Sequence, residues 1–148
     1  MTKEIVTLEK FNQLLTIVLK QIAKDDTLHP DALLALSTGG FPVAAAIAKR
    51  IGIKSRHVIG IPVYKDVTGD YHLDDTLVSL GDCTKRQVLV LDEAIKRGLL
   101  TRKAVAAVKE HGGQAKSCVL IAWKDGIQPD YVAETCRDEP PDFFWENK

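Results

Sequence analysis

The most constraining feature of this chain is an uninterrupted apolar run that ends in two carboxylates. Residues 88–91 read Val-Leu-Val-Leu, Asp92 and Glu93 follow directly, and a glycine stands at position 98. Apolar residues without polar alternation predict a strand that is buried on both faces, as in a parallel sheet. Ligands bind outside the carboxyl ends of such strands, so the acidic pair marks a candidate ligand site.

A second unit of the same kind lies upstream. Residues 31–36 predict another buried strand, and a helix is expected to start near Pro42. Between them we expect a glycine turn made of Ser37, Thr38, Gly39 and Gly40. Glycines let backbone N–H groups approach an anion that a side chain would block. The alternative is an ordinary turn from strand to helix, since Gly-Gly before a helix is common.

Both units resemble the type I phosphoribosyltransferases, and the C-terminal third resembles the small purine enzymes that accept xanthine, guanine or hypoxanthine. Those enzymes carry a hydrophobic strand, two acidic residues, a short loop with a third acid and Thr-Gly, and then a helix. The resemblance implies an α/β fold of three layers, with a mainly parallel central sheet and a small C-terminal hood element. Length and composition indicate one domain over residues 1–148. Both glycine turns are expected at one sheet edge as opposite walls of one cleft.

The resemblance also assigns roles to the loop after the acidic strand. Asp92 and Glu93 match the catalytic pair that grips the ribose hydroxyls of phosphoribosyl pyrophosphate. Mg²⁺ is implied only if phosphoribosyl pyrophosphate is bound, and the pair would then contact it indirectly. Lys96 replaces the loop acid that exchanges a proton with the base, and Leu100 replaces a hydroxyl residue, so both contributions are lost. The expected phosphate ligands are Lys96, Arg97, Gly98 and Thr101.

Two further regions match the family's base-binding and flap regions. Lys124 follows an apolar strand, where the family has a lysine that bonds the six-position oxygen of a purine. The family's stacking aromatic falls at Pro140 or Pro141 here, so Phe143 or Phe144 is the expected substitute. The alternatives are a surface lysine and an aromatic tail that packs on the core.

The polar segment 65–75 falls where the family has a mobile flap over its site. Tyr64 and Lys65 resemble residues near that flap and are candidate ligand contacts. A plain hairpin is the alternative, and we favour it over a catalytic lid.

Composition limits the partners. Lysine plus arginine and aspartate plus glutamate each number 20, so no net charge draws the chain to nucleic acid or to a membrane. No apolar run approaches the roughly 18 residues of a membrane span. The 3 cysteines lack metal-ligand spacing and no signal peptide is evident, so a cytoplasmic location is expected. The expected partner is a nucleotide or phosphoribosyl pyrophosphate, with assembly as a homodimer or homotetramer.

The elements alternate along the chain. Apolar spacing predicts a helix over residues 8–22 with Thr7 as its cap, and further helices are expected at 42–51 and 98–111. Strands are expected at 31–36, 57–64, 75–80, 87–92, 117–123 and 130–134.

The sequence therefore favours a purine-type phosphoribosyltransferase homologue that binds a ribose-phosphate ligand and has weak or doubtful transferase activity. A non-catalytic nucleotide-binding or regulatory protein on the same fold is the main alternative. A third is a structural or partner-binding role that uses the sheet edge or the aromatic tail.

Overall fold

A computed structural model describes residues 3–74 and 84–146, with the backbone alone at positions 37 and 38. Its centre is a five-stranded parallel sheet in the order β3-β2-β6-β7-β8. In that order the strands are Val58–Ile61, Ala32–Leu36, Gln87–Ile95, Gln114–Trp123 and Tyr131–Cys136. The sheet confirms the predicted fold class. The predicted strand at 75–80 lies outside the described residues.

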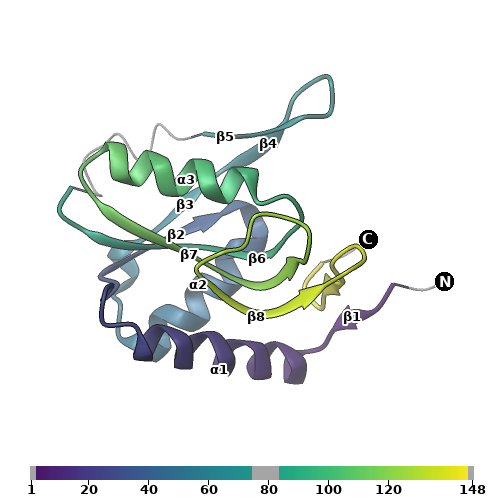
Figure 1. Cartoon of the computed structure of the whole chain (residues 1–148), viewed down its shortest axis with the longest axis horizontal. Helices are drawn as coiled ribbons and strands as arrows, with labels where there is room; N and C mark the ends of the chain where they lie inside the picture. The colour runs from purple at the N-terminus through teal and green to yellow at the C-terminus, as the bar shows by residue number, and fades with distance from the viewer. Residues whose placement is uncertain (1–2, 75–83, 147–148) are drawn as a thin grey trace.

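Helices cover both faces of this sheet, with α3 on one face and α1 and α2 on the other (Figure 1). They span Leu8–Lys24 (α1), Ser37–Ile51 (α2) and Leu99–Glu110 (α3), and a short 3₁₀ turn, η1, spans Ser55–His57. The predicted cap of α1 is confirmed, because Thr7 Oγ1 accepts a hydrogen bond of 3.2 Å from Lys10 N.

Alternate residues of the central strands supply two separate cores. Leu89 and Leu91 of β6 pack with α1 and α2, whereas Val88 and Val90 pack with the buried face of α3. Each of these four side chains is at most 1% exposed. This two-sided burial explains why the strand sequence shows no polar alternation.

The winding of the chain reverses between β2 and β6. From β2 the chain passes through α2 to β3, whereas from β6 it passes through α3 to β7 on the other side. Because β2 and β6 are parallel neighbours, with Ala35 opposite Leu91, the starts of α2 and α3 lie at the same sheet edge. The expected common edge is confirmed, and such a switch point is where open α/β sheets bind ligands.

The start of α2 differs from the prediction. The helix begins at Ser37, directly after β2, and Pro42 lies inside it. Gly39 and Gly40 are therefore helical residues and not a separate turn. A Cβ atom on Gly40 would lie 2.6 Å from the carbonyl oxygen of Leu91, so glycine lets the helix approach β6 closely.

Two small sheets complete the fold. The strands β4 (Val63–Lys65) and β5 (Tyr71–Leu73) are antiparallel, so part of the predicted polar segment forms a hairpin. The predicted strand at 57–64 was too long, because Pro62 separates β3 from β4 and has no N–H to donate. The strands β1 (Ile5–Val6) and β9 (Asp142–Phe143) pair in parallel and join the two ends of the chain.

Within residues 3–74 and 84–146, no helix combines the length and the apolar character needed to cross a bilayer.

Candidate functional site

The acidic pair lies at the switch point. β6 continues beyond its predicted end at residue 92 to Ile95, so Glu93 belongs to the strand together with Asp92. The side chain of Glu93 extends over the first turn of α2, where a Cβ atom on Gly39 would overlap its carboxylate. Gly39 therefore makes room for a carboxylate at the sheet edge.

In the part of the chain that the structure describes, the acidic pair has an unsatisfied hydrogen-bond acceptor and a perturbed pKa. Glu93 Oε2 is buried and has no hydrogen-bond partner among the described residues. Burial, together with a hydrogen bond to the Glu93 side chain, raises the pKa of Asp92 well above its usual range. The Asp92 carboxylate also accepts a hydrogen bond of 2.9 Å from the backbone N–H of Glu93. This arrangement suits a ligand whose hydroxyl groups donate hydrogen bonds to Glu93.

A hollow of about 290 Å³ opens beside Glu93. Four segments line it: the N-terminal segment, β5, the end of β6 with the loop that follows it, and residues 139–146, which form the C-terminal hood. The lining residues are Lys3, Tyr71, Glu93, Ala94, Lys96, Glu139, Pro140, Pro141, Asp142 and Glu146. Both lysines are ion-paired across it, Lys96 to Glu139 at 2.5 Å and Lys3 to Asp142 at 2.9 Å. Salt bridges thus connect the hood to the segment before β1 and to the loop after β6.

The structure separates the four expected phosphate ligands. Lys96 lines the hollow beside Glu93, and the neighbouring Arg97 is exposed. Gly98 is the N-cap of α3 with a φ of 79°, so a side chain there would be strained. Thr101 is buried, and its Oγ1 has no partner in the part of the chain that the structure describes.

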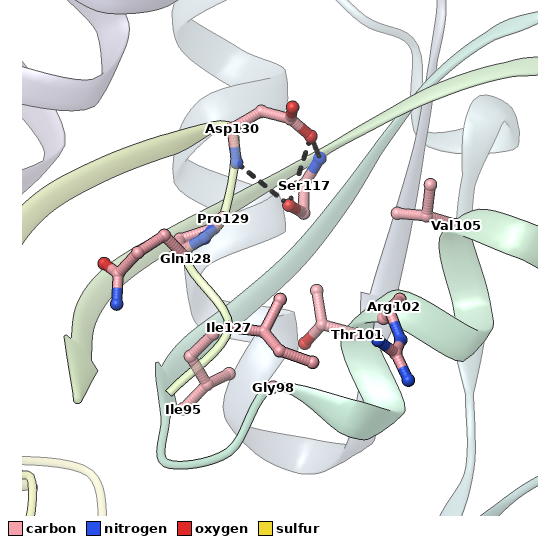
Figure 2. A pocket seen from close by; sticks show the side chains of 10 residues that line it. All are labelled: Ile95, Gly98, Thr101, Arg102, Val105, Ser117, Ile127, Gln128, Pro129 and Asp130. Carbon is pink, nitrogen blue, oxygen red and sulfur yellow. Dashed lines mark hydrogen bonds between the residues drawn. The ribbon is translucent and has the colours of Figure 1, made fainter. Parts of the chain in front are cut away.

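Thr101 and Gly98 line a different hollow of about 140 Å³, between α3 and the segment before β8 (Figure 2). Asp130 at its rim is already engaged, because its carboxylate accepts a hydrogen bond of 2.8 Å from Ser117 N. Ile95, Val105 and Ile127 make much of the remaining wall apolar. The acidic pair does not line this hollow, so Thr101 does not join Lys96 at one site.

The loop after β7 packs directly on the loop after β6. Ile127 N donates a hydrogen bond of 3.0 Å to the carbonyl oxygen of Arg97, and a Cβ atom on Gly126 would overlap the carbonyl oxygen of Lys96. Lys124, the expected base reader, is exposed at the end of β7 and lines neither hollow. In this structure the loop's backbone supports the site, and the ammonium of Lys124 does not enter it.

Phe143 and Trp145 of the aromatic tail pack in the core, whereas Phe144 is 46% exposed. Phe143 is 1% exposed and its ring stacks on Trp145 at 4.7 Å, while Phe144 meets Phe11 edge-on at 5.9 Å. Neither ring lines either of the two hollows, and the stacking of one of them on a base stays a prediction. Aromatic rings bury large apolar areas, and here Phe143 and Trp145 pack in the same core cluster as Phe11 of α1.

Tyr71 of the hairpin lines the hollow beside Glu93, and it was not among the site residues predicted from the sequence. Tyr64 stacks on His72 at 5.4 Å, and Lys65 Nζ lies 4.9 Å from the ring centroid of Tyr71. Tyr64 and Lys65 line neither hollow, whereas Tyr71 lines the one beside Glu93. The sequence signal that could have identified Tyr71 was its position within the polar segment 65–75. The side chains of Ser37 and Thr38 lie outside the described parts.

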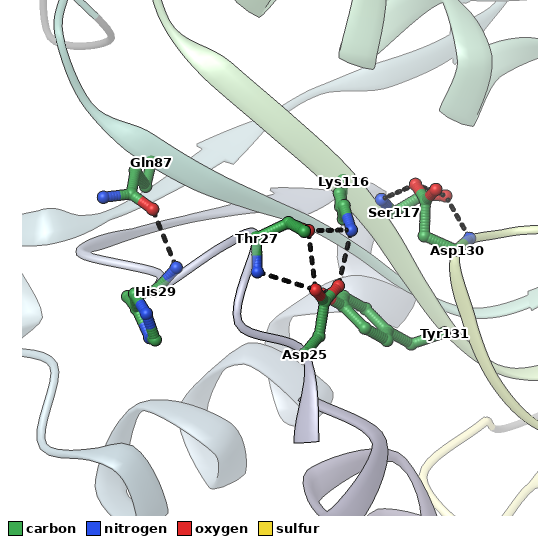
Figure 3. A network of polar contacts seen from close by, with 8 residues as sticks. All are labelled: Asp25, Thr27, His29, Gln87, Lys116, Ser117, Asp130 and Tyr131. Carbon is green, nitrogen blue, oxygen red and sulfur yellow. Dashed lines mark hydrogen bonds and ion pairs between the residues drawn. The ribbon is translucent and has the colours of Figure 1, made fainter. Parts of the chain in front are cut away.

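A polar network near the amino ends of β7 and β8 stabilises the edge of the sheet opposite the acidic pair (Figure 3). Asp25 accepts hydrogen bonds from Lys116 at 2.5 Å, Thr27 Oγ1 at 2.6 Å and Tyr131 OH at 2.6 Å. These donors, Lys116 foremost, hold the pKa of Asp25 well below its usual range. The network ties α1 to β7 and β8 and is part of the scaffold.

A doubly wound sheet with an acidic pair at its switch point is typical of α/β proteins that bind a ligand at the carboxyl edge of the sheet. The model of the phosphoribosyl transferase domain matches residues 1–148. The chain therefore belongs to the phosphoribosyl transferase domain family, which confirms the resemblance seen in the sequence.

Among curated proteins, the chain is similar to the bifunctional protein PyrR of Streptococcus gordonii, with 27% identity over 146 residues. The match covers 90% of this chain and 83% of that protein.

Three solved structures share the fold. The purine phosphoribosyltransferase from Pyrococcus horikoshii aligns with a TM-score of 0.78 at 16% identity, covering 100% of this chain and 96% of that one. The xanthine-guanine-hypoxanthine phosphoribosyltransferase of Helicobacter pylori gives 0.72 at 20% identity, covering 94% and 90%. A Neisseria gonorrhoeae protein solved with bound ppGpp gives 0.72 at 16% identity, covering 99% and 92%.

Proposed function

We propose that this protein binds a phosphorylated ribose ligand, either a purine nucleotide or phosphoribosyl pyrophosphate, at the carboxyl edge between β2 and β6. One observation carries the proposal: Glu93 Oε2 is buried at the switch point without a hydrogen-bond partner among the described residues. A buried acceptor left unpaired costs roughly 1–3 kcal/mol, and ribose hydroxyls would supply the missing donors. Asp92 and Glu93 would then orient the sugar.

The start of α3 supports a place for the phosphate. No side chain caps this helix, and a helix N-terminus offers free N–H groups and the positive end of its dipole to an anion. Arg97 directly precedes the N-cap of the helix, is exposed and adds positive charge. The phosphate would therefore be held by backbone N–H groups and charge in place of hydroxyl side chains.

Transferase activity is proposed to be weak or absent. Lys96 stands where the resemblance places the acid that exchanges a proton with the base, and its ammonium is paired with Glu139. Losing general acid–base help costs about 10²–10⁴ in rate. Leu100 has no hydroxyl to offer to the phosphate.

The acidic pair fits an indirect contact with Mg²⁺. The described residues contain no group of three or more His, Cys, Asp or Glu side chains that could hold a metal. Carboxylates suit a hard cation, and Glu93 Oε2 is an unpaired acceptor for a metal-bound water. Mg²⁺ would therefore arrive with the diphosphate of phosphoribosyl pyrophosphate, whose charge it would neutralise.

The second candidate is a non-catalytic nucleotide-binding or regulatory protein. The ion pair between Lys96 and Glu139 favours this candidate, because a lysine paired with the hood stands where the resemblance places a catalytic acid. The Neisseria gonorrhoeae protein, which shares the fold and was solved with ppGpp, provides a precedent for nucleotide binding on this scaffold.

Isothermal titration with phosphoribosyl pyrophosphate, guanosine 5′-monophosphate and free guanine tests the proposal, with and without Mg²⁺. We expect the phosphorylated ribosides to bind, and Glu93→Gln to weaken them by roughly tenfold or more. The matched control is Glu134→Gln on β8, where Glu134 forms an exposed ion pair of 3.1 Å with Lys10. No binding of any phosphorylated riboside refutes the proposal.

A transferase assay with the same compounds distinguishes the two candidates. Binding without turnover selects the regulatory protein. Turnover at an ordinary rate, about 1–10³ per second, would show that the loop after β6 is aligned wrongly with that of the family.

A further inference from the structure

The hollow beside Glu93 has a single aromatic wall in the part of the chain described. Tyr71 is the one aromatic residue among those that line it, and Ala94, Pro140 and Pro141 are its apolar neighbours there. The remaining lining residues are lysines and carboxylates. A flat heterocycle in this hollow would therefore find its stacking surface on β5 and not in the aromatic tail.

The ring of Tyr71 is available to a ligand. The residue is 59% exposed, and Lys65 Nζ lies 4.9 Å from the ring centroid. Lys65 and Tyr71 are direct partners across the β4–β5 hairpin, so the cation stays over the ring. With the cation over one face, the other face is the one a ligand would meet.

The hairpin is held in place by its own contacts. Asp66 Oδ1 accepts hydrogen bonds from Thr68 N at 2.8 Å and from Asp70 N at 3.0 Å, and Asp66 Oδ2 contacts His72 Nε2 at 2.6 Å. The His72 ring in turn stacks on Tyr64 at 5.4 Å. These local contacts pre-position Tyr71 before any ligand arrives, which reduces the ordering cost of binding.

We propose that Tyr71 is the platform on which the base of the bound nucleotide stacks, opposite the Pro140-Pro141 turn of the hood. This inference rests on the proposed function, because it takes the ribose to be held at Asp92 and Glu93. The hairpin then becomes a base-binding element, and the apolar proline pair completes a slot for a planar ring. Removing an aromatic platform typically weakens binding by roughly 5- to 150-fold per stacked base.

Titration of two ligands against Tyr71 variants tests the inference. Guanosine 5′-monophosphate carries a base and ribose 5-phosphate does not. We expect Tyr71→Ala to weaken the nucleotide by roughly 5- to 150-fold and to leave ribose 5-phosphate within about twofold of its wild-type affinity. Tyr71→Phe keeps the ring and is expected to restore nucleotide affinity. The matched control is Val67→Ala at the exposed tip of the same hairpin, which is expected to change neither affinity.

The outcomes separate this inference from the proposed function. Unchanged nucleotide affinity in Tyr71→Ala overturns the stacking role alone. Equal losses for both ligands also overturn it, because they indicate a general disturbance of the hairpin. If the wild-type protein binds neither ligand, the proposed function and the stacking role both fail.

Discussion

Replacing Gly39 by alanine directly tests the link between α2 and the acidic pair. The new Cβ atom would overlap the carboxylate of Glu93, so that side chain must leave its position over the helix. The backbone itself accepts alanine, because Gly39 is not among the glycines with positive φ. The substitution therefore displaces a proposed ribose ligand without straining the main chain.

The expected magnitude follows from the contact that is lost. A hydrogen bond to a charged group contributes about 1.5–3 kcal/mol, which corresponds to a loss of roughly 10- to 150-fold in nucleotide affinity. Alanine inside a helix is favoured over glycine by roughly 0.5–1 kcal/mol, which offsets part of the cost of moving Glu93. We therefore expect affinity to fall while the free energy of unfolding changes by less than about 1 kcal/mol.

Calorimetric titration with guanosine 5′-monophosphate, combined with urea unfolding, measures both quantities. Gly52→Ala is the matched control, because Gly52 has a φ of 79° with no atom within 4 Å of an added Cβ. It should cost about 1–2 kcal/mol of stability and leave affinity unchanged. The reasoning is refuted if Gly39→Ala binds the nucleotide as tightly as the wild-type protein.

Three further predictions concern the tail, the scaffold network and the loop after β6. Phe143→Ala should lower the free energy of unfolding by about 3–5 kcal/mol in urea titrations, since the ring is buried in the core; a loss under about 1 kcal/mol would contradict that role. The pKa of Asp25 is depressed in the folded state, so its contribution is present above its unfolded pKa of about 3.9 and is lost as the pH falls below it. Thermal unfolding across that range should show a flatter acid dependence in Asp25→Asn, and identical pH profiles would rule the network out. Arg97→Ala should weaken guanosine 5′-monophosphate by roughly tenfold or more and spare free guanine, whereas equal nucleotide affinities by calorimetry would remove Arg97 from the site.

Local patterns predicted most of the central fold. The apolar runs of β2, β6 and β7 are long enough to require burial on both faces, and the spacing of α1 specifies one buried stripe. The start of α2 was wrong because two glycines were interpreted as a turn, although here they allow close packing on β6. Strands β1 and β9 have two residues each, which is too short for any periodicity.

The site was only partly predictable. The placement of Asp92 and Glu93 at the sheet edge was predictable, because a carboxylate pair after an apolar run is a local signal. The partners of Lys96 and Lys3 were not, because Glu139 and Asp142 lie 43 and 139 residues away in sequence. Exposed ion pairs of this kind leave no pattern in one sequence. The oligomeric state, the absence of nucleic-acid partners and the cytoplasmic location stay predictions.

The parallel pairing of β1 with β9 has a consequence for biosynthesis. Val6 of β1 pairs with Phe143 of β9, and Lys3 lines the same hollow as the hood. At about 5–20 residues per second, on the order of 10 s of translation separates these partners. The sheet can start to assemble on the ribosome during that interval, but the hollow cannot close until its last wall has been made. A nascent chain would therefore not bind its ligand at this hollow until residues 139–146 have been synthesised.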